Sequence, residues 1–110
     1  MSTANHDTPQ WPAKVAELVD YQEGAIVSRI LMQGPGGSVT VFAFDRGQRL
    51  SEHTAPFDAL VQIVDGTATV TVEGVTRQVA AGGWILLPAN RPHAVEAPER
   101  CKMLLTMIRA

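Results

Sequence analysis

The stretch GQRLSEHTAPFDALVQIVDG, residues 47–66, changes character at its centre. It opens with a charged turn, passes a single histidine, His53, and becomes apolar over most of residues 59–64. A short apolar run bounded by turn residues is typical of a β-strand that is buried on both faces. Residues 59–64 are therefore predicted to form such a strand, with one histidine at its mouth.

The segments on both sides of this stretch also have the pattern of short strands. Further strands are expected at residues 24–32, 38–45, 67–73, 75–79, 82–88, 93–97 and 101–108. The turn signals between them include residues 33–37 and the dipeptide Glu73-Gly74, which predicts a tight hairpin. We expect residues 82–88 and 93–97 to pair with each other across a proline-rich link. Many short strands at regular spacing indicate an all-β sandwich or barrel.

The N-terminal part of the chain lacks this pattern. Residues 1–10 are polar and are expected to form a flexible tail. Residues 11–22 are compatible with one helical turn or with an irregular lead-in, because Pro12 argues against a long helix. We expect residues 11–110 to form a single domain, as the length of the chain suggests.

The composition excludes several classes of function. The formal net charge is −2, with acidic and basic residues interspersed, so no basic stripe is present for nucleic acid. No apolar run approaches the roughly 20 residues of a membrane span. The N-terminus does not resemble a secretory signal, and a single cysteine, Cys101, excludes a disulfide within the chain. We therefore expect a cytoplasmic protein that binds neither nucleic acid nor membrane.

Residues 47–66 resemble the first motif of the cupin superfamily. That motif runs Gly, five residues, His-x-His, three or four residues, Glu, six residues, Gly. Gly47, His53 and Gly66 match it at the family's spacing. The second histidine of the motif is Ala55 in this sequence, and the glutamate position is Ala59.

Residues 82–97 resemble the second cupin motif, which runs Gly, five residues, Pro-x-Gly, two residues, His, three residues, Asn. Gly82, Pro88 and His93 match it. Asn90 replaces the second glycine, and an asparagine there tolerates a left-handed turn conformation. Ala97 replaces the final asparagine.

The resemblance implies an antiparallel double-stranded β-helix, the jelly-roll barrel of the cupins. In metal-bound cupins two histidines and the glutamate of the first motif join the histidine of the second as ligands. Only His53 and His93 remain here as candidate ligands for a divalent transition metal. Asp58 lies next to the vacant glutamate position, but strand alternation directs it to the opposite face from Ala59.

We expect His53 and His93 to lie on facing strands and to converge in one cavity, where two alanines leave space. The expected pocket residues are His53, Ala55, Ala59, Val61, His93 and Met103.

The last strand offers sulfur atoms to the same cavity. Cys101, Met103, Leu105 and Met107 share one face by alternation. If that face lines the pocket, a sulfur ligand beside two histidines would suit copper(I) or zinc. The alternative is that these side chains simply fill an apolar core.

Three functions remain open from the sequence. The first is a small-molecule-binding protein with a degenerate metal site. The second is a metal-dependent enzyme of the oxygenase or isomerase type, which would use the two histidines and a non-standard third ligand. The third is a structural or accessory protein with an unused pocket.

The apolar outer faces of two strands need a cover. Leu60, Val64, Leu104 and Ile108 are expected on these outer faces. The N-terminal segment, through Leu18, Val19 and Tyr21, is one possible cover, and a second copy of the chain is another. The resemblance implies a homodimer, since small cupins commonly associate in this way.

Overall fold

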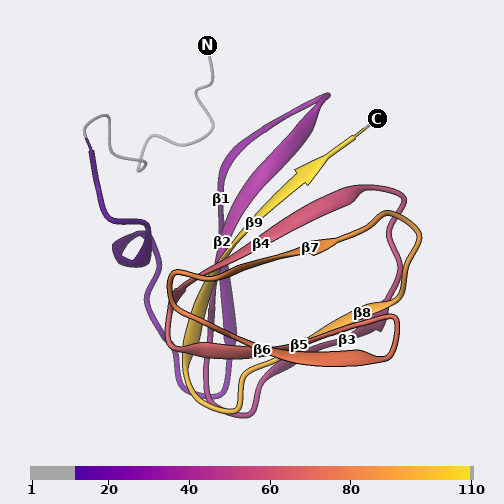
Figure 1. Cartoon of the computed structure of the whole chain (residues 1–110). Coiled ribbons are helices and arrows are strands. Elements are labelled where there is room, and N and C mark those ends of the chain that lie inside the picture. The colour runs from indigo at the N-terminus through magenta and orange to yellow at the C-terminus, as the bar shows by residue number, and fades with distance from the viewer. Residues whose placement is uncertain (1–11, 110) are drawn as a thin grey trace.

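A computed structural model describes residues 12–109, so the expected tail at residues 1–10 lies outside the described part. The described chain has one short 3₁₀ helix, η1 (Val15–Leu18), followed by strands (Figure 1). The strands are β1 (Ile26–Gly34), β2 (Gly37–Phe44), β3 (Arg49–His53), β4 (Asp58–Asp65), β5 (Thr67–Val72), β6 (Val75–Ala80), β7 (Trp84–Leu87), β8 (His93–Glu96) and β9 (Cys101–Ile108). No helix in residues 12–109 is long and apolar enough to cross a membrane.

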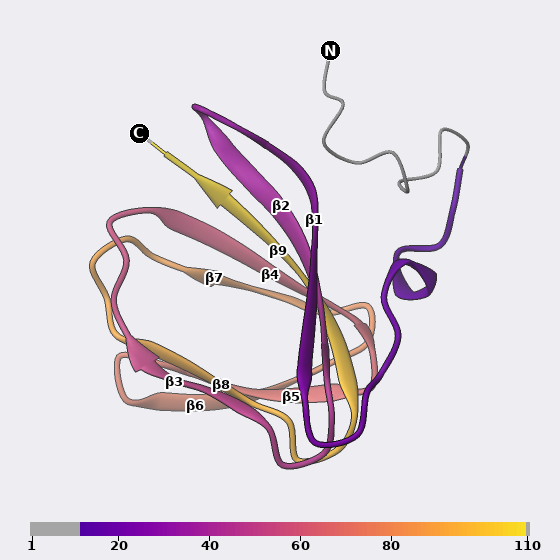
Figure 2. The ribbon, with the colours of Figure 1, turned by 180° about the vertical axis from the view of Figure 1, so that it is seen from behind.

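The strands form two antiparallel sheets. One sheet has the order β1-β2-β9-β4-β7, and the other has the order β3-β8-β5-β6. Seen from the front and from behind, β4 and β7 face the smaller sheet across the interior of the barrel (Figures 1 and 2). Neighbouring strands such as β2 and β9 are distant in sequence, as jelly-roll connections require. The predicted all-β jelly-roll fold is therefore confirmed.

The predicted hairpin at Glu73-Gly74 is present between β5 and β6. Glu73 has φ 51° and Gly74 has φ 80°, so both central residues adopt the left-handed conformation that a tight two-residue hairpin needs. Thr71 and Thr76 flank the turn and share a hydrogen bond between their hydroxyl groups at 2.9 Å.

The predicted pairing of residues 82–88 with 93–97 is wrong. β7 pairs with β4 in the larger sheet, whereas β8 pairs with β3 and β5 in the smaller one. The link between them contains two prolines, which cannot donate ladder hydrogen bonds. At its centre Asn90 has φ 64°, as its side chain allows, and donates its N–H to the carbonyl of Ala55 at 2.7 Å. The link therefore crosses between the sheets and delivers His93 to the interior of the barrel.

The core lies between the sheets and is built by alternation along each strand. In β4, Ala59, Val61 and Ile63 are buried, whereas Leu60 is half-buried and Gln62 is exposed. Only one face of β4 is therefore buried in the core, and the prediction that both faces are buried is wrong. A barrel buries the inner face of each strand and leaves the outer face to other cover.

The N-terminal segment covers part of that outer face. Val19 packs with Val41 and Ala43 of β2, and Leu18, Tyr21 and Leu104 pack against this cluster. Three polar contacts hold the segment in place. They are Arg29 Nη1 to the carbonyl of Leu18 at 3.1 Å, Lys102 Nζ to the carbonyl of Ala16 at 2.6 Å, and Tyr21 Oη to Asp65 at 2.5 Å. The segment therefore covers part of the outer face of β1, β2 and β9, as one of the two sequence alternatives expects.

Candidate functional site

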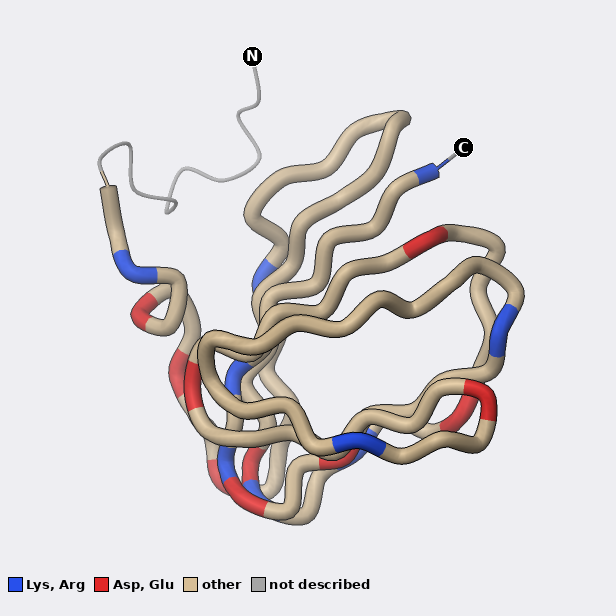
Figure 3. Tube along the Cα trace, viewed as in Figure 1, with Lys and Arg blue, Asp and Glu red and all other residues tan. Residues whose placement is uncertain are grey.

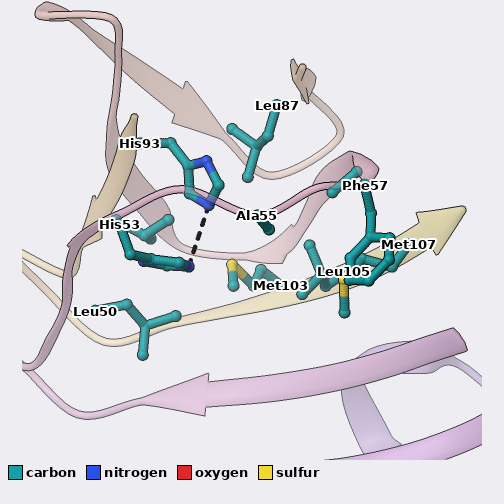
Figure 4. Close-up of a pocket in the computed structure, with 11 residues that line it drawn as sticks. Leu50, His53, Ala55, Phe57, Leu87, His93, Met103, Leu105 and Met107 are labelled. Carbon is teal, nitrogen blue, oxygen red and sulfur yellow. Dashed lines mark hydrogen bonds between the residues drawn. The ribbon is translucent and has the colours of Figure 1, made fainter. Parts of the chain in front are cut away.

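Two histidines meet at one end of the barrel interior (Figure 4). His53 is the last residue of β3, His93 is the first residue of β8, and the two are partners in the antiparallel ladder. Their Nε2 atoms lie 3.2 Å apart, and the ring centres are 4.4 Å apart with planes at 70°. Cross-strand partners on one face are natural neighbours. The structure therefore brings the two rings together from adjacent strands of one sheet, rather than from facing strands.

The backbone fixes the orientation of both rings. His53 Nδ1 lies 2.8 Å from the carbonyl oxygen of Ser51, and His93 Nδ1 lies 3.2 Å from that of Arg91. A carbonyl oxygen only accepts, so each Nδ1 carries a hydrogen and donates it. When the rings are neutral, both Nε2 atoms are therefore acceptors, and they point toward each other.

With both Nε2 atoms as acceptors, the histidine pair lacks a hydrogen or a cation between the two rings. The 3.2 Å contact between the two Nε2 atoms, drawn as a dashed line in Figure 4, is a hydrogen bond only when one Nε2 carries a hydrogen. Because each Nδ1 already holds the hydrogen of a neutral ring, one ring must take a second proton or a bound group must supply a hydrogen or a positive centre. Burial lowers the pKa of His93 below its ordinary value of 6.5, and the neighbouring His53 lowers it further, against the raising effect of the Arg91 carbonyl. His93 is 7% exposed and His53 is exposed. The pair therefore presents acceptor atoms from a buried ring and an accessible one.

The pair lines a cavity of about 90 Å³. Of the expected pocket residues, His53, Ala55, Ala59, His93 and Met103 line it, and Val61 does not. Val61 is fully buried in the core and lies one alternation step further along β4 than Ala59. The wall is completed by Leu50, Phe57, Leu87, Val95, Leu105 and Met107.

The alternation of the last strand indicates two of these additional wall residues, but the sequence does not indicate Leu50 or Phe57. Leu105 and Met107 share the inward face of β9 with Met103, so alternation brings them to the wall once that face is known to line the cavity. Leu50 could not be placed in this way, because the β3–β8 register shifts between Leu50 and His53. Phe57 precedes β4 and has no periodic signal.

The donor set does not fit a divalent metal centre of the cupin type. Alanines occupy two of the four ligand positions, and the described residues contain no group of three or more His, Cys, Asp and Glu able to hold a metal ion. Asp58 is exposed and accepts the N–H of Ala89 at 2.9 Å. Cys101 is fully buried away from the lining, and burial, with a smaller effect from Asp65, raises the pKa of its thiol to about 11.

Comparisons with known proteins agree with this fold. The family model for the cupin domain matches residues 40–108, and the chain belongs to this family. A conserved protein of unknown function from Streptococcus pyogenes is 34% identical, with 100% of this chain and 96% of that chain covered and a TM-score of 0.92. A cupin superfamily protein from Desulfitobacterium hafniense is 26% identical over 94% of this chain and 95% of that chain, with a TM-score of 0.89.

A third structure is longer than this chain. A cupin 2 conserved barrel domain protein from Leptotrichia buccalis is 45% identical over 86% of this chain, with a TM-score of 0.83. The match covers 46% of that protein, so the present chain corresponds to less than half of it. No protein of curated function matches the sequence.

Proposed function

We propose that this protein binds a small organic molecule that carries a hydroxyl group, and that the His53–His93 pair accepts the hydroxyl hydrogen. The observation that carries the proposal is the convergence of two Nε2 atoms, 3.2 Å apart, whose rings already use their Nδ1 hydrogens on the backbone. A hydroxyl donor satisfies one of these acceptors, and its oxygen accepts from the other when that ring is protonated.

The size and polarity of the cavity support a small ligand with an apolar body. A cavity of about 10–15 Å³ holds one water, and sites for drug-sized ligands reach about 300–1,000 Å³. At about 90 Å³ this cavity lies between the two. Every lining residue except the two histidines is apolar, so the body of the ligand is held by burial rather than by hydrogen bonds.

Binding is better supported than turnover. Catalysis on a small molecule needs a second polar group where charge develops in the transition state. The cavity lining contains no polar side chain besides the two imidazoles. The pair is therefore suited to recognition, and an enzymatic role would need a group that the lining does not contain.

A copper(I) ion is a second candidate for the same position. The thioethers of Met103 and Met107 line the cavity together with the two imidazoles, and in Figure 4 Met103 points toward the pair. Thioether and imidazole ligands without a carboxylate favour copper(I) over harder divalent ions. Metal analysis of the purified protein, and copper(I) titration after chelator treatment, separate this candidate from the organic ligand.

The organic ligand is tested with two isosteric probes. Pentan-1-ol and butyl methyl ether have the same number of heavy atoms, but only the alcohol is a donor. We expect the alcohol to bind chelator-treated protein about three- to tenfold more tightly than the ether, as one net hydrogen bond implies. Calorimetric titration gives both affinities, and a rise in melting temperature gives an independent reading through mass action.

Two variants distinguish the histidine pair from the cavity. His53→Phe keeps a ring but removes one of the two Nε2 acceptors, and is expected to reduce the preference for the alcohol. Ala55→Leu fills the cavity and is expected to weaken both probes while both imidazoles remain. His6→Ala, which changes the one histidine of the sequence besides His53 and His93, serves as the control. Equal affinities for alcohol and ether in the wild type would contradict the role of the pair.

We also propose that a second copy of the chain covers the rest of the outer face. The ladder pairs form one row across the larger sheet, consisting of Leu86, Leu60, Thr106, Val39 and Met32. Met32 is 65% exposed and Leu86 is 50% exposed, and the nearby β7 carries no charge (Figure 3). Light scattering is expected to give a dimer that the Leu86→Glu variant dissociates. A wild-type monomer at high concentration would contradict this proposal.

A further inference from the structure

A second polar element lies at the other end of the cavity from the histidine pair. Phe57 lines the cavity, and Figure 4 shows it at the end opposite His53 and His93. The guanidinium carbon of Arg109 lies 5.2 Å from the centre of the Phe57 ring, a typical cation–π distance. Arg109 is exposed and follows β9 directly, after the pocket residue Met107. Arg109 does not itself line the cavity, but its guanidinium packs on the ring of Phe57, so a positive charge lies next to a residue of the cavity wall.

Among the described residues, that charge forms no ion pair. Arg91 pairs with Glu73 at 2.7 Å and Arg100 pairs with Asp45 at 2.8 Å, but no such partner is found for Arg109. Asp58 is the acidic residue next to Phe57 in the sequence, and its carboxylate accepts the N–H of Ala89. The cavity lining itself contains no carboxylate. The guanidinium is thus available to a negative group on a bound molecule.

We propose that the ligand is a short-chain hydroxy acid, whose hydroxyl meets the histidine pair and whose carboxylate meets Arg109. This inference rests on the proposed function, because it assigns a ligand class to the same cavity. The apolar chain of the acid lies against Met103 and Leu105, which line the cavity. The guanidinium fork of arginine matches a carboxylate in shape and charge.

This assignment uses both the histidine pair, which lines the cavity, and Arg109, which packs on a lining residue. A neutral alcohol would use the acceptor atoms of the imidazoles and would make no ion pair with the guanidinium. A simple fatty acid would use the guanidinium and leave the two Nε2 atoms facing each other. A molecule with a hydroxyl and a carboxylate separated by a short apolar spacer satisfies both ends.

The test compares three matched compounds by calorimetric titration. 6-Hydroxyhexanoate has both groups, 6-hydroxyhexanamide lacks the charge, and hexanoate lacks the hydroxyl. Shorter hydroxy acids, down to 3-hydroxypropanoate, extend the series to other spacer lengths. We expect the best-fitting hydroxy acid to bind about fivefold more tightly than its amide, the upper range for an exposed ion pair. Added salt is expected to weaken the binding of the acid and to leave the binding of the amide unchanged.

Variants assign the charge preference to Arg109. Arg109→Gln is expected to equalise the affinities of the acid and the amide, and Arg109→Lys to retain part of the difference. Arg46→Gln is the matched control, because it changes the net charge equally at an exposed turn between β2 and β3. A preference that is lost in Arg109→Gln and kept in Arg46→Gln supports the inference.

The remaining outcomes overturn it in distinguishable ways. If Arg109→Gln keeps the preference for the acid and His53→Phe loses it, the histidine pair binds the carboxylate. The role proposed for Arg109 in binding the carboxylate is then wrong. If the wild type binds the acid and the amide equally, the hydroxy acid class is wrong while the proposed binding function stands. If no compound of the series and no simple alcohol binds, both the inference and the proposed function fail.

Discussion

The double variant Ala55→His/Ala59→Glu is expected to bind a divalent metal ion tightly and to depend on it for stability. The two substitutions place an imidazole and a carboxylate at positions that line the same cavity as His53 and His93. Four such ligands make a site for zinc or for another divalent ion, whereas two imidazoles are short of one. The wild-type chain lacks this donor set, so the variant tests whether the four motif positions converge.

The effect on stability is expected to be large and to change sign with the metal. Ala59 is 7% exposed, and a glutamate buried there without a partner is expected to cost about 3 kcal/mol in the metal-free variant. Zinc at a thousand times its dissociation constant stabilises the folded state by about 4 kcal/mol. Thermal unfolding with chelator and with zinc measures both values.

Ala55→His/Ala59→Gln is the control, because it has the same side-chain size without the carboxylate. Zinc is expected to raise the melting temperature of this control much less than that of the glutamate variant. A melting temperature of the glutamate variant that does not respond to zinc, cobalt or manganese would show that these four positions do not meet.

Gly66→Ala is expected to cost about 4 kcal/mol of folding free energy, which is at the upper end for a single substitution. Gly66 joins β4 to β5 with φ 73°, a conformation that strains any residue with a Cβ. A Cβ at this position would also collide with the backbone carbonyl of Arg100, immediately before β9. Because the obstacle is backbone, relief would require the start of β9 to move.

Gly82→Ala separates the two causes. Gly82 has φ 93°, but a Cβ there would meet nothing within 4 Å. It is expected to cost only the conformational strain, about 1–2 kcal/mol. Urea denaturation of both variants measures the difference. Equal losses would mean that the close approach of Gly66 to Arg100 does not contribute.

The sequence is sufficient for the fold class, because its alternation, its turn residues and its resemblance to the cupins agree. Alternation identifies the strands, and Glu73-Gly74 identifies a hairpin, in which the positive φ of Gly74 is one that glycine adopts without strain. The motif spacing places His53 and His93 at one site, where the structure has their Nε2 atoms 3.2 Å apart. These predictions depend on short-range geometry and on a resemblance, and neither requires the order of strands in the sheets.

The errors occur where long-range pairing decides. The sequence of the proline-rich link is typical of a hairpin connection, yet the link crosses between the two sheets. Only the complete strand order shows which strands pair with β7 and β8. Val61 shares the inward face of β4 with Ala59 but does not line the cavity, and alternation does not indicate which inward residues reach it. Phe57 and Arg109 are far apart in the sequence, so no local pattern predicts their contact.

The central claim is tested most directly by the protonation of the imidazole nitrogens. Long-range ¹H–¹⁵N spectra of the His6→Ala variant contain signals from His53 and His93 only. Above the pH at which histidines titrate, we predict that both rings carry their hydrogen on Nδ1 and leave both Nε2 atoms bare. Hydrogens on Nε2 of both rings would mean that the Ser51 and Arg91 carbonyls do not fix them, and the acceptor site proposed here would not exist.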